Sequence, residues 1–164
     1  MLRPIAILKI SAICLGVVFI AGCSKKDKPE LAVQGQEQAI PGSERDFIVN
    51  VGDRIQFLVD QSTLTAQAQD TLQRQAAWMK QYGQVSVQVE GHADERGTRE
   101  YNIALSARRA TAARQFLIAQ GIDPSRISKI AYGKERPVAL CDAESCWSQN
   151  RRAVTIVTGG AVSG

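Results

Sequence analysis

A strictly alternating stretch of apolar and polar residues at positions 85–89 constrains the fold of this chain more than any other feature. A period of two predicts a strand with one buried face. Apolar residues recur at helical spacing on both sides of it. They predict helices over residues 65–81 and 101–120, with Thr65 as the N-cap of the first. A strand between two amphipathic helices favours helices packed on a sheet.

Three further segments have the composition of strands. They are residues 54–59, 127–132 and 152–158, and each contains β-branched residues. The resulting order predicts an α+β fold, a two-layer sandwich in which helices pack on one face of a mixed four-stranded sheet. Its core is βαβαβ, and one last strand follows. A chain of 164 residues is long enough for one such domain with appendages.

The first 22 residues have the three parts of a secretory signal peptide. Arg3 and Lys9 give a positive start, residues 10–20 form an apolar run that is short for a membrane span, and two small residues follow. The next residue is Cys23. This junction is similar to the bacterial lipobox, in which the cysteine sulfur takes a diacylglycerol. The alternative is a plain signal peptide with an incidental cysteine. Ser24 favours the outer membrane, because an aspartate at this position often retains lipoproteins in the inner membrane.

Residues 23–45 are polar, contain proline and glycine, and show no sustained apolar period. They predict a lipidated cysteine followed by a flexible tether, with the folded domain over residues 46–164. The net charge is +4 at pH 7, and two of these charges lie in the signal peptide. The remaining charge is too balanced for a nucleic-acid-binding surface, so we expect no nucleic-acid partner.

The densest polar segment joins the alternating strand to the following helix. Its sequence is Gly91-His92-Ala93-Asp94-Glu95-Arg96-Gly97-Thr98. Ligands often bind at such a junction, because backbone N–H groups point outward where a helix begins. The helix carries two adjacent arginines. Arg109 shares its stripe with Leu105 and Phe116, whereas Arg108 lies on a more polar stripe. Arg109 is therefore predicted to face the sheet and to need a partner, for which Asp94 is a candidate.

Asp94 and Arg109 together have the chemistry to bind a zwitterion. A carboxylate binds an ammonium group, and a guanidinium binds a carboxylate through two parallel hydrogen bonds. The other interpretation is a structural salt bridge that orients the helix. The pattern of residues alone favours this second interpretation.

Several motifs, in order, resemble one known family. After the polar segment come Glu100-Tyr101-Asn102, Leu105-Ser106, Arg108-Arg109-Ala110, Tyr132-Gly133-Lys134-Glu135-Arg136-Pro137 and Asn150-Arg151-Arg152-Ala153. Over about residues 54–158 they resemble the outer-membrane protein A-like (OmpA-like) domain family, and within it the peptidoglycan-associated lipoproteins of the Tol–Pal system. The resemblance implies non-covalent binding of peptidoglycan through the diaminopimelate of its peptide stem, whose free end is a zwitterion.

The resemblance also implies roles for individual residues and partners. Asp94 would take the ammonium group and Arg109 the carboxylate, while Asp60, Thr98 and Asn102 would complete the pocket. TolB and the Tol complex are the implied protein partners. The implied location is the outer membrane, with the domain facing the periplasm, and the implied role is in envelope integrity and constriction at cell division.

Two features depart from the family pattern. Val59 stands directly before Asp60, where many members have an aromatic residue, and this predicts a thinner apolar wall for the pocket. Cys141 and Cys146 lie in a loop where many relatives lack cysteines. In the oxidising periplasm we expect them to form a disulfide, the alternative being two free thiols.

Other functions have weaker support in the sequence. His92 is the only histidine, so we expect no metal site and assign the residue a hydrogen-bonding role in its loop. Asp94 and Glu95 are the candidate pair for a peptidoglycan hydrolase, but adjacent residues rarely direct two carboxyls at one bond. No Gly-x-Ser-x-Gly motif is present. We expect a binding protein without a cofactor, not an enzyme. A flagellar stator component would need a transmembrane helix in place of the lipobox.

Overall fold

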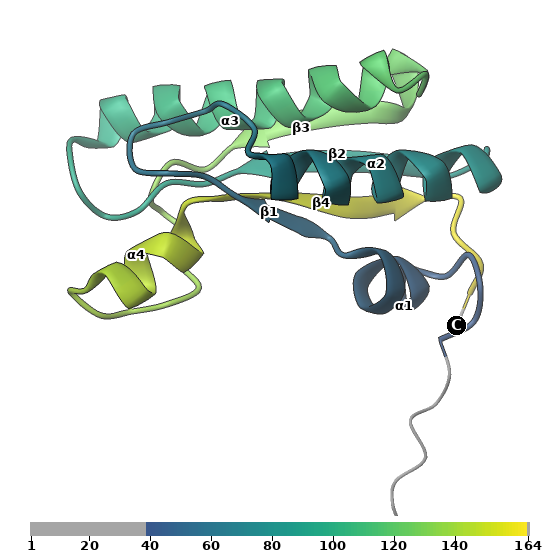
Figure 1. The fold of residues 1–164 in the computed structure, drawn as a ribbon, viewed down its shortest axis with the longest axis horizontal. Coiled ribbons are helices and arrows are strands. Elements are labelled where there is room, and N and C mark those ends of the chain that lie inside the picture. The colour runs from purple at the N-terminus through teal and green to yellow at the C-terminus, as the bar shows by residue number, and fades with distance from the viewer. Residues whose placement is uncertain (1–38, 164) are drawn as a thin grey trace, which may run out of the picture. The chain divides into compact units, whose positions relative to one another are not determined.

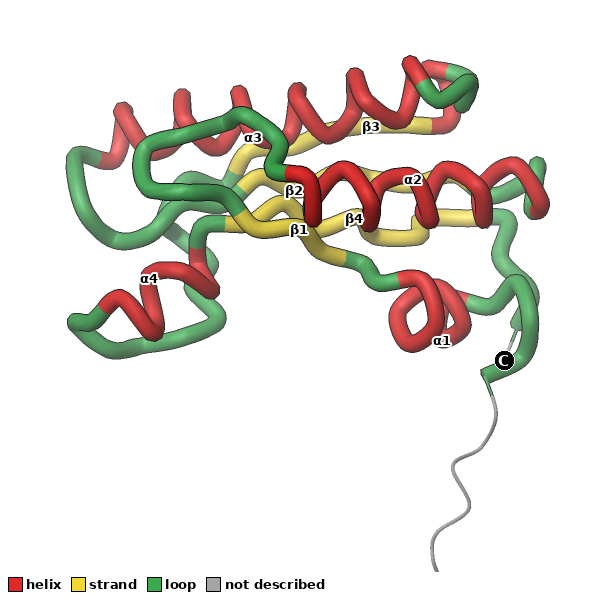
Figure 2. Tube along the Cα trace, in the orientation of Figure 1, coloured by secondary structure: helices red, strands yellow, loops and turns green. Residues whose placement is uncertain are grey.

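The computed structural model describes residues 39–163, whose helices, strands and loops are distinguished in Figure 2. In chain order the elements are α1 (Glu44–Asp46), a π-helical turn (Phe47–Val51), β1 (Arg54–Gln56), α2 (Ala66–Gln81), β2 (Ser86–Gly91), α3 (Arg99–Ala119), a 3-10 turn (Pro124–Arg126), β3 (Ile127–Ala131), α4 (Glu144–Asn150) and β4 (Arg152–Gly159). None of the helices in the described range has the length and apolar character that a membrane span requires.

The four strands form one mixed sheet in the order β1-β4-β2-β3. β4 runs antiparallel to both of its neighbours, and β2 runs parallel to β3. The parallel pair is joined by α3, since parallel strands need a crossover connection. Figure 1 shows α2 and α3 lying along the sheet. The arrangement confirms the predicted α+β sandwich, with its βαβαβ core and last strand.

Both long helices cover the same face of the sheet. Val89 and Thr155 are paired across β2 and β4, so their side chains share a face, and there Thr155 Oγ1 donates to Gln75 Oε1 of α2 at 2.8 Å. On that face Gly91 lies so close to α3 that an added Cβ would be 1.9 Å from the Ser106 carbonyl oxygen. A glycine is therefore required where β2 ends and the polar loop begins.

The two long helices begin at threonine caps and bury their apolar sides. Thr65 Oγ1 accepts from the N–H of Ala68, as predicted, and Thr98 Oγ1 accepts from the N–H of Tyr101, each at 3.2 Å. The core between helices and sheet is continuous and apolar. Its fully buried members include Leu72, Met79, Val85, Val87, Val89 and Leu117.

Two differences from the sequence-based expectation lie at the end of β1 and at α4; α1 and the turns at residues 47–51 and 124–126 were also not predicted. β1 ends at Gln56, not at residue 59, because the chain turns at Asp60, whose φ is 57°. Within this turn the N–H of Gln61 donates to the carbonyl of Leu58 at 3.2 Å. The second difference is α4, in a segment without a predicted element. Its 7 residues are too few for a helical period to be recognised.

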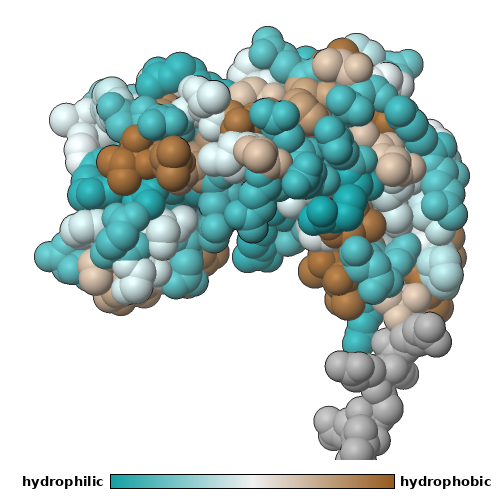
Figure 3. All heavy atoms as spheres, viewed as in Figure 1, coloured by the Kyte–Doolittle hydropathy of each residue, from teal (hydrophilic) through white to brown (hydrophobic). Residues whose placement is uncertain are grey.

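The two ends of the sheet carry different features. α1 and the first and last described segments lie at one end, and a parallel bridge joins Ser43 to Val162 there. α4 and the loop between β2 and α3 lie at the other end (Figure 1). In Figure 3, apolar atoms gather near α1 and along the loop after β1. Exposed apolar residues of these two segments are Ile48 and Val49, and Leu58 and Val59.

Candidate functional site

A pocket of about 290 Å³ lies between the loop after β1, the loop after β2 and the first half of α3. Its lining combines acidic, basic and apolar side chains, namely Val59, Asp60, Asp94, Arg96, Gly97, Tyr101, Asn102, Leu105 and Arg109. Four of the five residues predicted for the site are among them. The fifth, Thr98, is exposed and does not line the pocket; its side chain caps α3.

Arg109 is fully buried, with 0% of its surface exposed. Its Nε donates to the carbonyl of Gln61 at 2.9 Å, Nη1 to that of His92 at 2.9 Å and Nη2 to that of Leu58 at 3.2 Å. Burial lowers the pKa of Arg109 to about 10, so the group stays charged at neutral pH. Three of its five N–H groups donate to these carbonyls, which leaves two further N–H groups on a side chain that lines the pocket.

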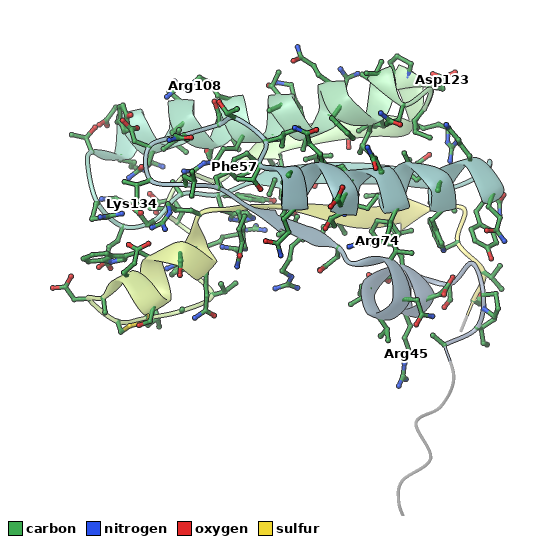
Figure 4. The ribbon with its side chains drawn as sticks, in the orientation of Figure 1. Arg45, Phe57, Arg74, Arg108, Asp123 and Lys134 are labelled. Atoms are coloured by element: carbon green, nitrogen blue, oxygen red, sulfur yellow. A yellow bond between two sulfur atoms is a disulfide. The ribbon has the colours of Figure 1, made fainter. Side chains whose placement is uncertain are left out.

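The predicted orientation of the two adjacent arginines is confirmed. Arg109 faces the sheet, and its guanidinium carbon lies 5.2 Å from the centre of the Phe57 ring. Arg108 is exposed and points away from α3 (Figure 4). Spacing along the helix was therefore sufficient to separate them.

Asp94 forms its ion pairs with two arginines other than Arg109. Its Oδ2 accepts from Arg96 Nη2 at 2.6 Å and from Arg151 Nη1 at 3.2 Å, and its Oδ1 accepts from the backbone N–H of Arg96 at 3.2 Å. Burial alone would raise the pKa of Asp94, but the hydrogen bonds from Arg96 and Arg151 outweigh it and hold the pKa below its ordinary 3.8. The carboxylate is therefore negative at neutral pH.

Asp60 and Asn102 also line the pocket. Asp60 sits at the positive-φ turn, and its Oδ1 accepts a hydrogen bond from the hydroxyl of Tyr101. Asn102 is buried, and its Nδ2 donates to the carbonyl of Arg96 at 2.8 Å. This bond ties the loop after β2 to the first turn of α3. Lys134 strengthens the same loop, because its Nζ lies 3.0 Å from the carbonyl of Glu95 and 2.8 Å from that of Gly97 (Figure 4).

α4 supplies a second layer behind Asp94. Trp147 Nε1 donates to Glu95 Oε1 at 2.8 Å, and the guanidinium carbon of Arg96 lies 4.3 Å from the centre of the Trp147 ring. Glu144 forms an ion pair with Arg151. Within this segment Cys141 and Cys146 form a disulfide, which confirms that prediction.

Sequence reasoning missed Arg96, Arg151, Tyr101 and Trp147 as members of this site. Arg151 belongs to the motif at 150–153 that was recognised, but the motif alone does not give a role to each of its arginines. The predicted lipidation residue, Cys23, lies outside the described residues.

The side chain of His92 differs from the expectation. It is 2% exposed, and neither ring nitrogen has a hydrogen-bond partner among the described residues. The ring stacks on Tyr132, with centroids 5.6 Å apart. Burial, followed by the charges of Arg152 and Arg136, lowers the pKa of His92 to about 4. The hydrogen-bonding role predicted for this residue belongs to its carbonyl, which holds Arg109. No cluster of metal-ligating side chains is found in residues 39–163.

Comparison of the sequence with known proteins shows the family of this chain. Residues 56–151 match the OmpA family. A peptidoglycan-associated lipoprotein from Mesorhizobium japonicum is 58% identical over 149 residues, which cover 88% of this chain and 89% of that protein. The chain belongs to the peptidoglycan-associated lipoproteins. A more distant lipoprotein of this name, from Pseudomonas aeruginosa, is 38% identical over 88% of this chain and 93% of its own length.

Solved structures of this family and of a second protein share the fold. The crystal structure of the peptidoglycan-associated lipoprotein from Burkholderia pseudomallei is 38% identical and superposes with a TM-score of 0.63, over 65% of this chain and 90% of that chain. The C-terminal domain of Helicobacter pylori MotB gives a TM-score of 0.61 at 22% identity, over 65% and 84% of the two chains. This second likeness concerns the fold alone.

Proposed function

We propose that this lipoprotein holds peptidoglycan non-covalently by binding the zwitterionic end of diaminopimelate in the peptide stem. The observation that carries the proposal is that Asp94 and Arg109, one negative and one positive, line the same pocket. The ammonium group binds Asp94, and the carboxylate binds the two remaining N–H groups of Arg109. Asp60 and Asn102 line the pocket beside them and contact the rest of the ligand.

Binding is favoured over hydrolysis by the state of the two acidic residues. A general acid needs a carboxyl group whose pKa is raised, whereas hydrogen bonds from arginines lower the pKa of Asp94. Glu95 is bonded to the indole of Trp147 and does not line the pocket. We therefore propose that the domain is not an enzyme.

The proposed setting is the periplasmic side of the outer membrane. Lipid on Cys23 anchors the protein there, and residues 23–45 connect the anchor to the domain. TolB and the Tol complex are the proposed protein partners, with a role in constriction at cell division. Fatty-acid labelling that persists after Cys23→Ala would exclude the anchor. Crosslinking in cells that captures the wall but never TolB would exclude that partner.

Binding is tested with the whole chain purified in detergent and sedimented with isolated sacculi. Asp94→Asn removes the negative charge at nearly constant volume. The loss of one partner of a desolvated charge pair is worth about 2–5 kcal/mol, so we expect about thirtyfold weaker binding or more. Asp70→Asn is the matched control, because Asp70 is an exposed carboxylate on α2 outside the pocket.

Two outcomes decide against the proposal. Full binding by Asp94→Asn would remove the zwitterion mechanism. Release of soluble fragments from the sacculi by the wild-type chain would favour a hydrolase over an anchor.

A further inference from the structure

We propose that Trp147, held in place by the Cys141–Cys146 disulfide, is a positioning residue that sets the affinity of the pocket for an ammonium-bearing ligand. It acts through Arg96, which stands between Trp147 and Asp94. This inference rests on the proposed function of the pocket around Asp94.

The disulfide fixes a helix that is too short to be stable alone. α4 has 7 residues, and isolated helices of that length do not persist in water. Cys146, in the first turn of α4, is bonded to Cys141 before the helix begins. At the other end of α4, Asn150 accepts from the N–H of Val138 at 2.8 Å and donates to the carbonyl of Ala139 at 2.8 Å. Both contacts join α4 to the loop that precedes it, and Trp147 directly follows the bonded cysteine.

Trp147 in turn fixes Arg96. The indole N–H donates to Glu95 at 2.8 Å, which sets the orientation of the ring, and the guanidinium of Arg96 lies 4.3 Å from the ring centre. A cation over the face of an indole is attracted by the ring quadrupole. Arg96 lines the pocket, whereas Trp147 does not. The ring therefore supports Arg96 from the side away from the ligand.

Arg96 determines how much of the Asp94 carboxylate a ligand can use. Its Nη2 lies 2.6 Å from Asp94 Oδ2, the same oxygen that accepts from Arg151. Asp94 Oδ1 accepts from the backbone N–H of Arg96, so an ammonium group can bind this oxygen while the Arg96 side chain stays on Oδ2. With the ring in place, the guanidinium of Arg96 is held against Oδ2 and away from the ligand. Without the ring, the side chain of Arg96, which is 40% exposed, is free to lie across the pocket and to block the ligand.

The test uses the whole chain in detergent and a soluble muropeptide with a diaminopimelate-containing stem, titrated by calorimetry. We expect Trp147→Ala to bind about three- to tenfold more weakly, because the variant loses one exposed cation–π contact and one hydrogen bond. The Cys141→Ser/Cys146→Ser double variant should show a loss in the same direction. Trp147→Phe keeps the ring face and should recover part of the affinity.

Two further variants separate positioning from general destabilisation. In an Arg96→Gln background, Trp147→Ala should cause no additional loss, because its effect passes through Arg96. Tyr82→Ala is the matched control. Tyr82 is a half-buried aromatic residue that packs on Trp78 of α2 and does not line the pocket, so binding should be unchanged.

The outcomes distinguish this inference from the proposed function. If the wild-type chain does not bind the muropeptide, or if Asp94→Asn binds it equally well, the proposed function fails. If wild type binds and Asp94→Asn does not, while Trp147→Ala and Cys141→Ser/Cys146→Ser bind like wild type, only the inference fails. An equal loss for Trp147→Ala with and without Arg96 also overturns it.

Discussion

On the α3 side of the pocket, Arg109 is bonded to three backbone carbonyls, whereas on the α4 side Asp94 is bonded mainly to the side chains of two other arginines. Backbone carbonyls move only when the fold moves. Side-chain partners such as Arg96 change position by rotation about single bonds. The positive half of the pocket is therefore fixed by the fold, while the negative half is adjustable.

This difference separates stability from binding. Arg109 holds the loop after β1 against the end of β2, so its loss affects the whole domain. Asp94 lies in a network that includes exposed groups such as Glu144, whose side chain is 59% exposed. Changes on the α4 side should alter binding more than folding. The predictions below test this distinction, from the largest expected effect to the smallest.

Replacing Arg109 by Met should destabilise the domain by about 3–5 kcal/mol, because it leaves the carbonyls of His92 and Gln61 without their donor and removes one of the two donors to the Leu58 carbonyl. Urea denaturation at pH 7 measures this loss. Arg108→Met is the matched control on the next position of α3, and its exposed side chain should leave the free energy of unfolding nearly unchanged. Similar losses for the two variants would show that the α3 side is not fixed by Arg109.

Lowering the pH from 7 to 5 should destabilise the domain by about 2 kcal/mol through His92. The pKa of His92 is lowered from 6.5 to about 4 by burial, so the unfolded chain binds a proton more readily than the folded one. Its contribution to stability is complete above pH 6.5 and is lost as the pH falls toward 4. Asp94 and Asp46, whose pKa values are held below 3.8, stabilise the fold at both pH 7 and pH 5. Their contribution to stability is lost only at lower pH.

His92→Gln is the comparison variant for this pH dependence. Glu90, Arg136 and Arg152 surround the ring and remain in place in the variant. Unfolding curves of the variant should be much less sensitive to pH between 5 and 7. A slope as steep as that of the wild type would assign the pH dependence to other groups.

Replacing Glu144 by Gln should have the smallest effect on stability. Its exposed carboxylate pairs with the buried Arg151, which keeps its bonds to Asp94 and to the Phe57 carbonyl in the variant, and solvent screens the exposed partner. We expect a slight decrease in the thermal midpoint at low salt that disappears near about 1 M salt, where the Debye length is short. A large decrease that persists at high salt would place the α4 side among the elements that fix the fold.

The elements whose apolar residues recur at a regular spacing were predictable from sequence. Alternation at residues 85–89 and helical spacing on either side gave the central strand and both long helices. The same spacing distinguished Arg109 from Arg108. These predictions succeeded because a face buried against a sheet leaves a periodic record in the sequence.

Features that depend on non-periodic contacts were not predictable. α4 is held by a disulfide and by Asn150, so no apolar stripe marks it. The bonding of Asp94 to Arg96 and Arg151, instead of to Arg109, depends on where three loops meet. β1 is shorter than expected because the chain turns at Asp60, where the carbonyl of Leu58 bonds Gln61 and Arg109 and not a neighbouring strand.

The placement of the pocket and of α1 at opposite ends of the sheet has a mechanical consequence. If the pocket is held and the chain is pulled at its first described residues, the load runs along the strands. β1 is then drawn lengthwise past β4, and the hydrogen bonds between Arg54–Gln56 and their partners resist together in shear. The bridge between Ser43 and Val162 takes up the load first. A domain loaded in this direction transmits tension instead of being peeled open strand by strand.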